Sequence, residues 1–155
     1  MKKQTNRAAL IAGALMALFA FMAMGVAAQD MMQDKMMMDK SRPTVAIIRA
    51  DWCSACQKLE PTMMELMSQY KDRLNFVMLD VTTDEKAAES AKTASKLGIG
   101  KLFAANKKNT STVIVLGKKN KILFKTTHNY DRDAYVRAFD NAVAKASSMS
   151  MKKGG

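Results

Sequence analysis

The chain contains two cysteines, Cys53 and Cys56, and their separation by two residues suits thiol–disulfide exchange. They follow a short apolar run of β type, residues 44–50, and precede a stretch whose apolar side chains recur every three or four residues, as in an amphipathic helix. This order places Cys53 at the helix N-terminus, where unpaired backbone N–H groups and the helix dipole stabilise a thiolate. We therefore expect Cys53 to attack a disulfide and Cys56, about one turn further along, to resolve the mixed disulfide.

The same cysteine pair could instead hold zinc or form a structural disulfide. Structural zinc takes four ligands, but the chain has no second cysteine pair, and its single histidine, His128, is distant in sequence. A bridge that closes so short a loop constrains the unfolded chain little, so a purely structural disulfide is also disfavoured. The sequence therefore favours redox chemistry and predicts no zinc site.

The segment Ala50-Asp51-Trp52-Cys53-Ser54-Ala55-Cys56, with Pro61 five residues later, resembles the motif of the thioredoxin family, and the resemblance covers residues 43–146. It implies an α/β fold, a three-layer sandwich in which a central mixed sheet carries helices on both faces. It also implies a thiol–disulfide oxidoreductase that needs no cofactor beyond its own Cys53–Cys56 disulfide. Substrate-binding or site-shaping positions implied by the resemblance are Trp52, Ser54, Ala55, Ser111 and Thr112.

Two positions depart from the pattern of this family. Ile47 stands six positions before the first cysteine, where these proteins usually carry a buried acid, so the usual proton acceptor for Cys56 is missing. Ser111 stands where a cis-proline usually precedes the third strand. We expect a trans Thr110–Ser111 bond, because a cis bond before a residue other than proline is costly. The smaller serine predicts altered substrate docking and a gap beside the reduced cysteines that Cu(I) would fit.

The remaining elements follow from hydrophobic pattern and capping residues. We expect a second buried strand at 74–81, a helix at 85–97 capped by residues 82–84, a helical piece at 101–106, and hairpin strands at 112–116 and 121–125. Asp131 can cap a last helix. One face of that helix carries Tyr135, Phe139, Ala142, Val143 and Ala146. Residues 147–155 offer no core positions and are predicted to form a flexible tail.

Residues 1–28 have the pattern of an export signal. Lys2, Lys3 and Arg7 precede an apolar stretch that ends in Val-Ala-Ala, as a signal peptide does, and the stretch is also long enough for an uncleaved membrane anchor. Either outcome leaves the positive residues inside and places the cysteine domain outside the cytoplasm, for example in a periplasm. We expect membrane contact only through this segment, and a membrane-bound electron donor or acceptor is a candidate partner.

Residues 29–42 form a methionine-rich linker by composition. Thioether sulfur is a soft ligand that suits Cu(I), so the alternative function is copper binding or delivery through the cysteine pair and methionines. A flexible tether or a sink for oxidants is the simpler interpretation, because the chain has 15 methionines in all. His128 is a candidate acid–base group or soft-metal ligand, although a lone loop histidine is usually just solvated.

The formal net charge of +11 favours anionic partners or membrane headgroups. The lysines are scattered and no aromatic residues are interleaved with them, so we expect no nucleic-acid binding. An inert interaction module is disfavoured because both reactive cysteines are present. The leading hypothesis is an exported thiol–disulfide oxidoreductase that acts on protein thiols or disulfides, with the direction of electron flow left open.

Overall fold

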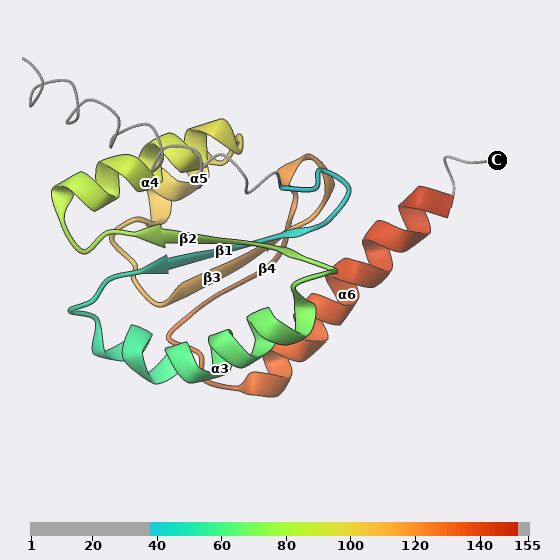
Figure 1. Cartoon of the computed structure of the whole chain (residues 1–155), viewed down its shortest axis with the longest axis horizontal. Coiled ribbons are helices and arrows are strands. Elements are labelled where there is room, and N and C mark those ends of the chain that lie inside the picture. The colour runs from blue at the N-terminus through green and yellow to red at the C-terminus, as the bar shows by residue number, and fades with distance from the viewer. Residues whose placement is uncertain (1–37, 152–155) are drawn as a thin grey trace, which may run out of the picture. The chain divides into compact units, whose positions relative to one another are not determined.

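A computed structural model describes residues 38–151 of the chain (Figure 1). The predicted signal peptide or anchor and most of the methionine-rich linker lie outside these residues, as do residues 152–155. Within residues 38–151, no helix combines the length and the apolar character needed to cross a bilayer.

Four strands form one mixed sheet in the order β2-β1-β3-β4. The central strand β1 pairs in parallel with β2 and antiparallel with β3, and β3 continues antiparallel to β4. This arrangement confirms the predicted mixed sheet, with strand ends that differ from expectation by one or two residues. The bounds are β1 Thr44–Arg49, β2 Asn75–Asp80, β3 Thr112–Leu116 and β4 Ile122–Thr127.

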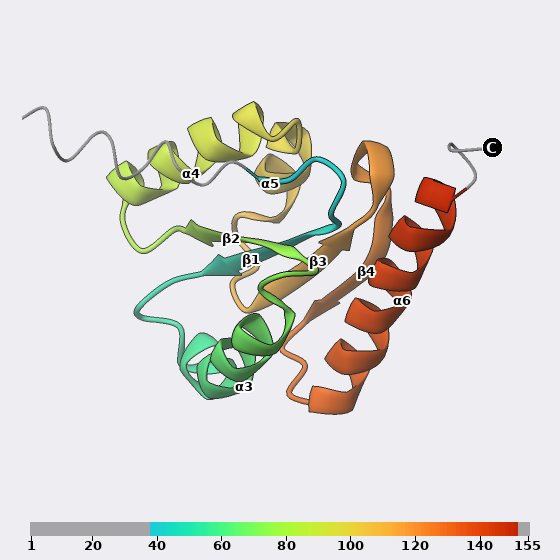
Figure 2. The same ribbon diagram turned by 45° about the vertical axis from the view of Figure 1, so that its right-hand side comes forward.

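Helices cover both faces of the sheet, which confirms the predicted three-layer sandwich (Figure 1). Figure 2 shows α3 and α6 on one side of the strands and α4 and α5 on the other. A short 3-10 turn connects β3 to β4. The bounds are α3 Ser54–Tyr70, α4 Asp84–Lys96, α5 Gly100–Asn106, the 3-10 turn Lys118–Asn120 and α6 Arg132–Met151.

Strand β1 contributes to two hydrophobic cores, one on each face of the sheet. Successive side chains of a strand point to opposite faces. Val45 and Ile47 accordingly pack with α3 and α6, whereas Ala46 and Ile48 pack with α4 and α5. Because both faces are covered, the strand reads as an uninterrupted apolar run rather than as an alternating pattern.

An aromatic cluster joins α6 to the α3 side of the sheet. The ring of Phe139, which is fully buried, lies 5.3 Å from that of Tyr70, 5.8 Å from that of Phe76 and 6.3 Å from that of Tyr135, measured between ring centroids. These distances lie in the range where aromatic pairs attract one another. The apolar face predicted for the last helix is therefore the face that packs, and it holds α6 against the helix that begins at the cysteines.

Strand β2 lies next to β1, at the place of the predicted second buried strand, but it is an edge strand and is only partly buried. Val77 and Leu79 face the α4 and α5 layer and are buried, whereas 45% of Met78 on the other face is exposed. No strand pairs with the outer side of β2 among the described residues. Position in a sheet depends on pairing partners, which the apolar run alone does not specify.

Both ends of the compact part extend beyond the expected limits. Helix α6 continues to Met151, so the first five residues of the expected tail are helical. No glycine or proline interrupts this stretch, and the Ser147 hydroxyl donates to the carbonyl of Val143 at 3.1 Å. At the other end, the Asn75 side-chain amide donates to the carbonyl of Asp39 at 2.8 Å, which attaches residues ahead of Pro43 to the domain.

Candidate active site

The junction between β1 and α3 places Cys53 at the N-cap of the helix. The chain leaves the strand after Arg49, and a turn closes where the Cys53 N–H donates to the carbonyl of Ala50 at 3.2 Å. Cys53 has an extended backbone, with φ −88° and ψ 102°, as an N-cap residue should. Its carbonyl accepts the first helical hydrogen bonds, from Cys56 at 3.0 Å and Gln57 at 3.1 Å.

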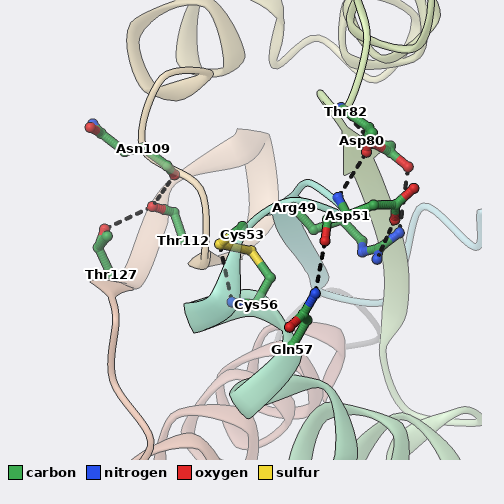
Figure 3. Close-up of a disulfide and its surroundings, with 10 residues drawn as sticks. All are labelled: Arg49, Asp51, Cys53, Cys56, Gln57, Asp80, Thr82, Asn109, Thr112 and Thr127. Atoms are coloured by element: carbon green, nitrogen blue, oxygen red, sulfur yellow. Dashed lines mark hydrogen bonds and ion pairs between the residues drawn. A yellow bond between two sulfur atoms is a disulfide. The ribbon is translucent and has the colours of Figure 1, made fainter.

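Cys53 and Cys56 are joined in a disulfide, with their Cα atoms 5.2 Å apart (Figure 3). The Sγ atom of Cys53 accepts a hydrogen bond from the Cys56 N–H at 3.1 Å, so the sulfur itself caps the helix. No acidic residue lies in the first turn to oppose a negative charge there. When the disulfide is opened, this position therefore favours a thiolate at Cys53.

Exposure does not distinguish the two cysteines, since 6% of Cys53 and 7% of Cys56 are accessible. Their surroundings do distinguish them. Cys53 lies at the end of the helix, whereas Cys56 lines a partly open pocket between α3 and the sheet. The arrangement thus gives one sulfur the helix end and the other an apolar environment.

Trp52 projects into solvent beside the disulfide, with 65% of its surface exposed. Hydrogen bonds nevertheless hold its loop on the segment after β2, because the Trp52 ring N–H donates to the Thr82 carbonyl at 3.1 Å and the Asp51 N–H donates to the Thr82 hydroxyl at 2.9 Å. The Gln57 side chain donates to the carbonyl of Asp51 at 2.9 Å. An exposed aromatic ring on a loop fixed in this way is suited to contact a partner.

A network of charged side chains holds the same loop (Figure 3). Arg49 pairs with Asp51 at 2.8 Å and with Asp80 at 3.4 Å, and Lys86 lies 3.3 Å from both carboxylates. Burial by itself would raise the pKa of Asp80, but hydrogen bonds from Thr82 and Lys86 outweigh it and hold that pKa below its usual value. Hydrogen bonds to Asp80 and Asp51 raise the pKa of Lys86. Asp80 and Lys86 therefore each favour their charged form.

Ser111 is almost completely buried and has an uncommon backbone conformation. Its φ is +58°, in the left-handed region, and 1% of its surface is exposed. The Thr110–Ser111 peptide bond is trans, as expected, since residues 38–151 contain no cis peptide bond. The neighbouring Thr112 hydroxyl donates to the Asn109 carbonyl at 2.6 Å (Figure 3). The Ser111 hydroxyl has no hydrogen-bond partner among the described residues.

His128 reaches this region through its backbone. Its N–H donates to the Ser111 carbonyl at 3.1 Å, and its own φ is +55°. The residue as a whole is exposed. The structure therefore brings the His128 main chain to the loop before β3, and an acid–base role for its side chain stays a prediction.

A pocket of about 50 Å³ lies beneath Cys56 and Ser111. Ile47, at the position of the missing proton acceptor, lines this pocket. The pairing of β1 with β2 places Met78 opposite Ile47, so neither of these two positions supplies an acid. Arg49 and Glu60 are the ionisable side chains besides the cysteine that line it. Four methionines contribute to its walls, Met63, Met64, Met67 and Met78.

The sequence did not single out these methionines as site residues. The spacing of Met63 and Met67 signalled only a packed helix face, and the pairing of Met78 with Ile47 cannot be derived from local pattern. In the part of the chain that the structure describes, no three side chains of histidine, cysteine, aspartate or glutamate gather as a metal site. The methionines add soft thioether sulfur, a ligand that suits Cu(I), to the lining of this pocket.

A family model described as Thioredoxin matches residues 26–126 of the chain. Over 44 residues the chain is 48% identical to the chloroplastic thioredoxin-like protein HCF164 of Oryza sativa subsp. japonica, a match that covers 28% of this chain and 17% of that protein. Over 48 residues it is 40% identical to the thiol:disulfide interchange protein TxlA homolog of Synechocystis sp., a match that covers 31% of this chain and 27% of that protein. The matched stretches therefore span less than a third of either relative.

Among solved structures, the chain is similar to one titled "Solution Structure of a Thioredoxin-like Protein in the Oxidized Form". The TM-score is 0.49 and the sequence identity 17%, over 67% of this chain and 79% of that one.

Proposed function

The chain belongs to the thioredoxin family, and we propose that it is a thiol–disulfide oxidoreductase in which Cys53 attacks and Cys56 resolves. The observation that carries this proposal is the Cys53–Cys56 disulfide at the N-cap of α3, with the Cys56 N–H donating to the Cys53 sulfur. A cysteine in this position is stabilised as a thiolate, which is the attacking species in exchange.

The reductive direction consists of two displacements. The Cys53 thiolate attacks a substrate disulfide, so that a bond forms between Cys53 and one substrate sulfur while the other leaves as a thiolate. Cys56 loses its proton and attacks Cys53, which forms the internal disulfide and releases the second substrate thiolate. Two electrons pass from the dithiol to the substrate. The same steps in reverse oxidise a substrate dithiol, and the reduction potential against a glutathione buffer decides which direction operates.

Proteins with accessible thiols or disulfides are the proposed substrates. The exposed ring of Trp52 offers them an apolar contact, and Ser54, Ala55, Ser111 and Thr112 are the remaining substrate-binding or site-shaping positions. An extracytoplasmic location and a membrane-bound electron partner belong to the same proposal. They are supported by the basic and apolar pattern of residues 1–28.

The order in which the two cysteines react tests the assignment of roles. After reduction of the full chain, iodoacetamide at mildly acidic pH is expected to modify Cys53 at least several-fold faster than Cys56, because the helix end favours its thiolate. Mass spectrometry of the cysteine peptide in samples quenched at intervals measures both rates. Faster modification of Cys56 would contradict the assignment.

The methionine-lined pocket favours a second candidate function, the capture of Cu(I). Met63 and Met67 lie one turn apart on α3, and Met64 and Met78 are partly open to solvent at the same pocket, so an incoming ion would meet thioether sulfur at its mouth. The copper would be cargo, and the family's exchange chemistry does not require it.

Competition with a chromophoric Cu(I) chelator tests this candidate in the full chain. The background carries Cys53→Ser and Cys56→Ser, together with leucine at Met31, Met32, Met36, Met37 and Met38 to remove the linker sulfurs. We expect one bound ion, and about tenfold weaker binding after Met64→Leu and Met78→Leu, because soft ligands are lost while apolar volume is retained. If replacing the linker methionines already abolishes Cu(I) binding, with Met64 and Met78 still present, the pocket is rejected as the site.

A further inference from the structure

The hydroxyl group of Ser111 is a buried polar group that lacks a partner. Its Oγ atom makes no hydrogen bond to any described residue, and only 1% of the surface of the residue is exposed. Such groups are uncommon in folded proteins and call for an explanation. The neighbouring hydroxyl of Thr112, by contrast, donates to the Asn109 carbonyl at 2.6 Å and lies 2.7 Å from the hydroxyl of Thr127.

The backbone fixes the position of this hydroxyl. The antiparallel pairing of β3 with β4 has Thr112 and Thr127 as its terminal pair, and just beyond them the His128 N–H donates to the Ser111 carbonyl at 3.1 Å. Both Ser111 and His128 have left-handed φ values, +58° and +55°. Residues other than glycine adopt such values where the surroundings impose them, frequently at functional sites. The serine is therefore held in place, and its side chain is shielded from water.

Cys56 is the reactive side chain that shares a pocket with this hydroxyl. Cys56 and Ser111 line the same pocket, and in the closed disulfide the Cys56 sulfur is bonded to Cys53. When the disulfide opens, a sulfur that carries negative charge faces walls that are mainly apolar. A hydrogen-bond donor on this sulfur would offset the loss of solvation.

The charged groups at the pocket do not serve this purpose. Arg49 from β1 is engaged by the carboxylates of Asp51 and Asp80. Glu60 from α3 carries a negative charge of its own when ionised. Met78 from β2 brings no ionisable group, and His128 meets the Ser111 loop through its main chain.

We propose that the Ser111 hydroxyl donates a hydrogen bond to the Cys56 sulfur whenever the Cys53–Cys56 disulfide is open, and thereby stabilises the thiolate that resolves the mixed disulfide. The inference rests on the proposed exchange function. In the resolving step Cys56 gives its proton to water, its sulfur bonds to Cys53, and the bond between Cys53 and the substrate breaks. The electron pair of that bond leaves with the substrate sulfur, and Ser111 keeps its proton throughout.

Dithiobis-nitrobenzoate, a symmetric aromatic disulfide, separates the two steps. Attack by Cys53 releases one coloured thiolate, and resolution by Cys56 releases the second, so stopped-flow absorbance of the reduced full chain reports both rates. In Ser111→Ala and Ser111→Gly we expect an unchanged first release and a second release slower by about tenfold, as loss of a hydrogen bond to a charged sulfur predicts. The pH midpoint of the second release should rise by about one unit, which is the same factor of ten.

Ser90→Ala is the matched control, because it removes another buried serine hydroxyl, one that donates to the Asp80 carbonyl at 2.8 Å. We expect it to leave both releases and the pH midpoint unchanged. The glycine variant adopts a left-handed φ without strain, so a defect in Ser111→Ala that is absent in Ser111→Gly would assign the effect to the backbone and overturn the proposal.

Two further outcomes would overturn the inference. An unaltered second release in both Ser111 variants would show that the hydroxyl does not act on Cys56. If Glu60→Gln abolished the pH dependence of the second release while Ser111→Ala left it unchanged, the role would belong to the carboxylate of Glu60. Failure of the exchange function itself looks different, since the wild-type chain would then give no first release, or Cys53→Ser would still give one.

Discussion

Cys56→Ser is expected to hold substrate proteins covalently on Cys53, whereas Cys53→Ser is expected to reduce exchange to the uncatalysed level. Without Cys56 the mixed disulfide has no resolving thiol beside it, so it persists until an external thiol attacks. Without Cys53 the remaining sulfur lines the pocket and lacks the N–H donors of the helix end, which favour a thiolate at Cys53. Turnover of a disulfide-bonded protein substrate, monitored by its reduction, measures the loss in each variant.

Non-reducing electrophoresis after incubation with oxidised substrate proteins detects the trapped species. Bands of higher mass should appear for Cys56→Ser, vanish on addition of dithiothreitol, and be missing from a chain that carries both substitutions. Equal trapping by the two single variants, or trapping by neither, would favour a metal carrier or an inert module over an oxidoreductase.

The position of Cys53 could be predicted because it depends on local sequence. A run of β-branched residues ends at the turn before Cys53, and a helical period begins directly after it, so the change of period marks the helix end. The sandwich could be predicted for a similar reason. Strand β1 is apolar at consecutive positions, which requires cover on both faces of the sheet.

The walls of the pocket could not be predicted in the same way. The contact between Ile47 and Met78 depends on the register of two strands that are distant in the chain, and the apolar run at β2 does not reveal that β2 lies at an edge. The ion pair of Asp51 with Lys86 likewise forms only when the segment after β2 folds back on the cysteine loop. Such features are tertiary, and no local period encodes them.

The conformation of Ser111 is a further feature that the sequence does not display. Serine has no special preference for left-handed φ, and here the residue with that value accepts a hydrogen bond from His128, a residue distant in the chain. Sequence comparison with the family motif marked the position as unusual because proline is missing. The unpartnered hydroxyl, and the pocket it shares with Cys56, became visible only in three dimensions.

Placing an acid at the pocket is expected to be costly. Ile47 is 4% exposed in the central strand and packs with Leu59 and Met63 under α3. Ile47→Asp removes this apolar contact and buries a carboxyl group, so we expect a loss of about 3–5 kcal/mol in the free energy of unfolding at neutral pH. Ile47→Val, which keeps most of the apolar volume, should cost about 0.5–1.5 kcal/mol. Urea unfolding followed by circular dichroism measures both values.

The pH dependence of that loss is the sharper test of the pocket's polarity. Apolar walls and the nearby Glu60 disfavour a second negative charge, so the pKa of the introduced carboxyl should be higher in the folded chain than in the unfolded one. A folded-state pKa that is raised in an acid leaves the protein most stable where the group is protonated. The difference in free energy of unfolding between Ile47→Asp and the wild type should therefore be smallest near pH 4 and grow until the pH passes the raised pKa.

A difference in free energy of unfolding that is constant between about pH 4 and pH 8 would mean that the carboxylate is hydrated and that Cys56 resolves disulfides in a wet pocket. An apolar pocket predicts the rising curve, and it is in such a pocket that the single hydroxyl of Ser111 would matter to the Cys56 sulfur.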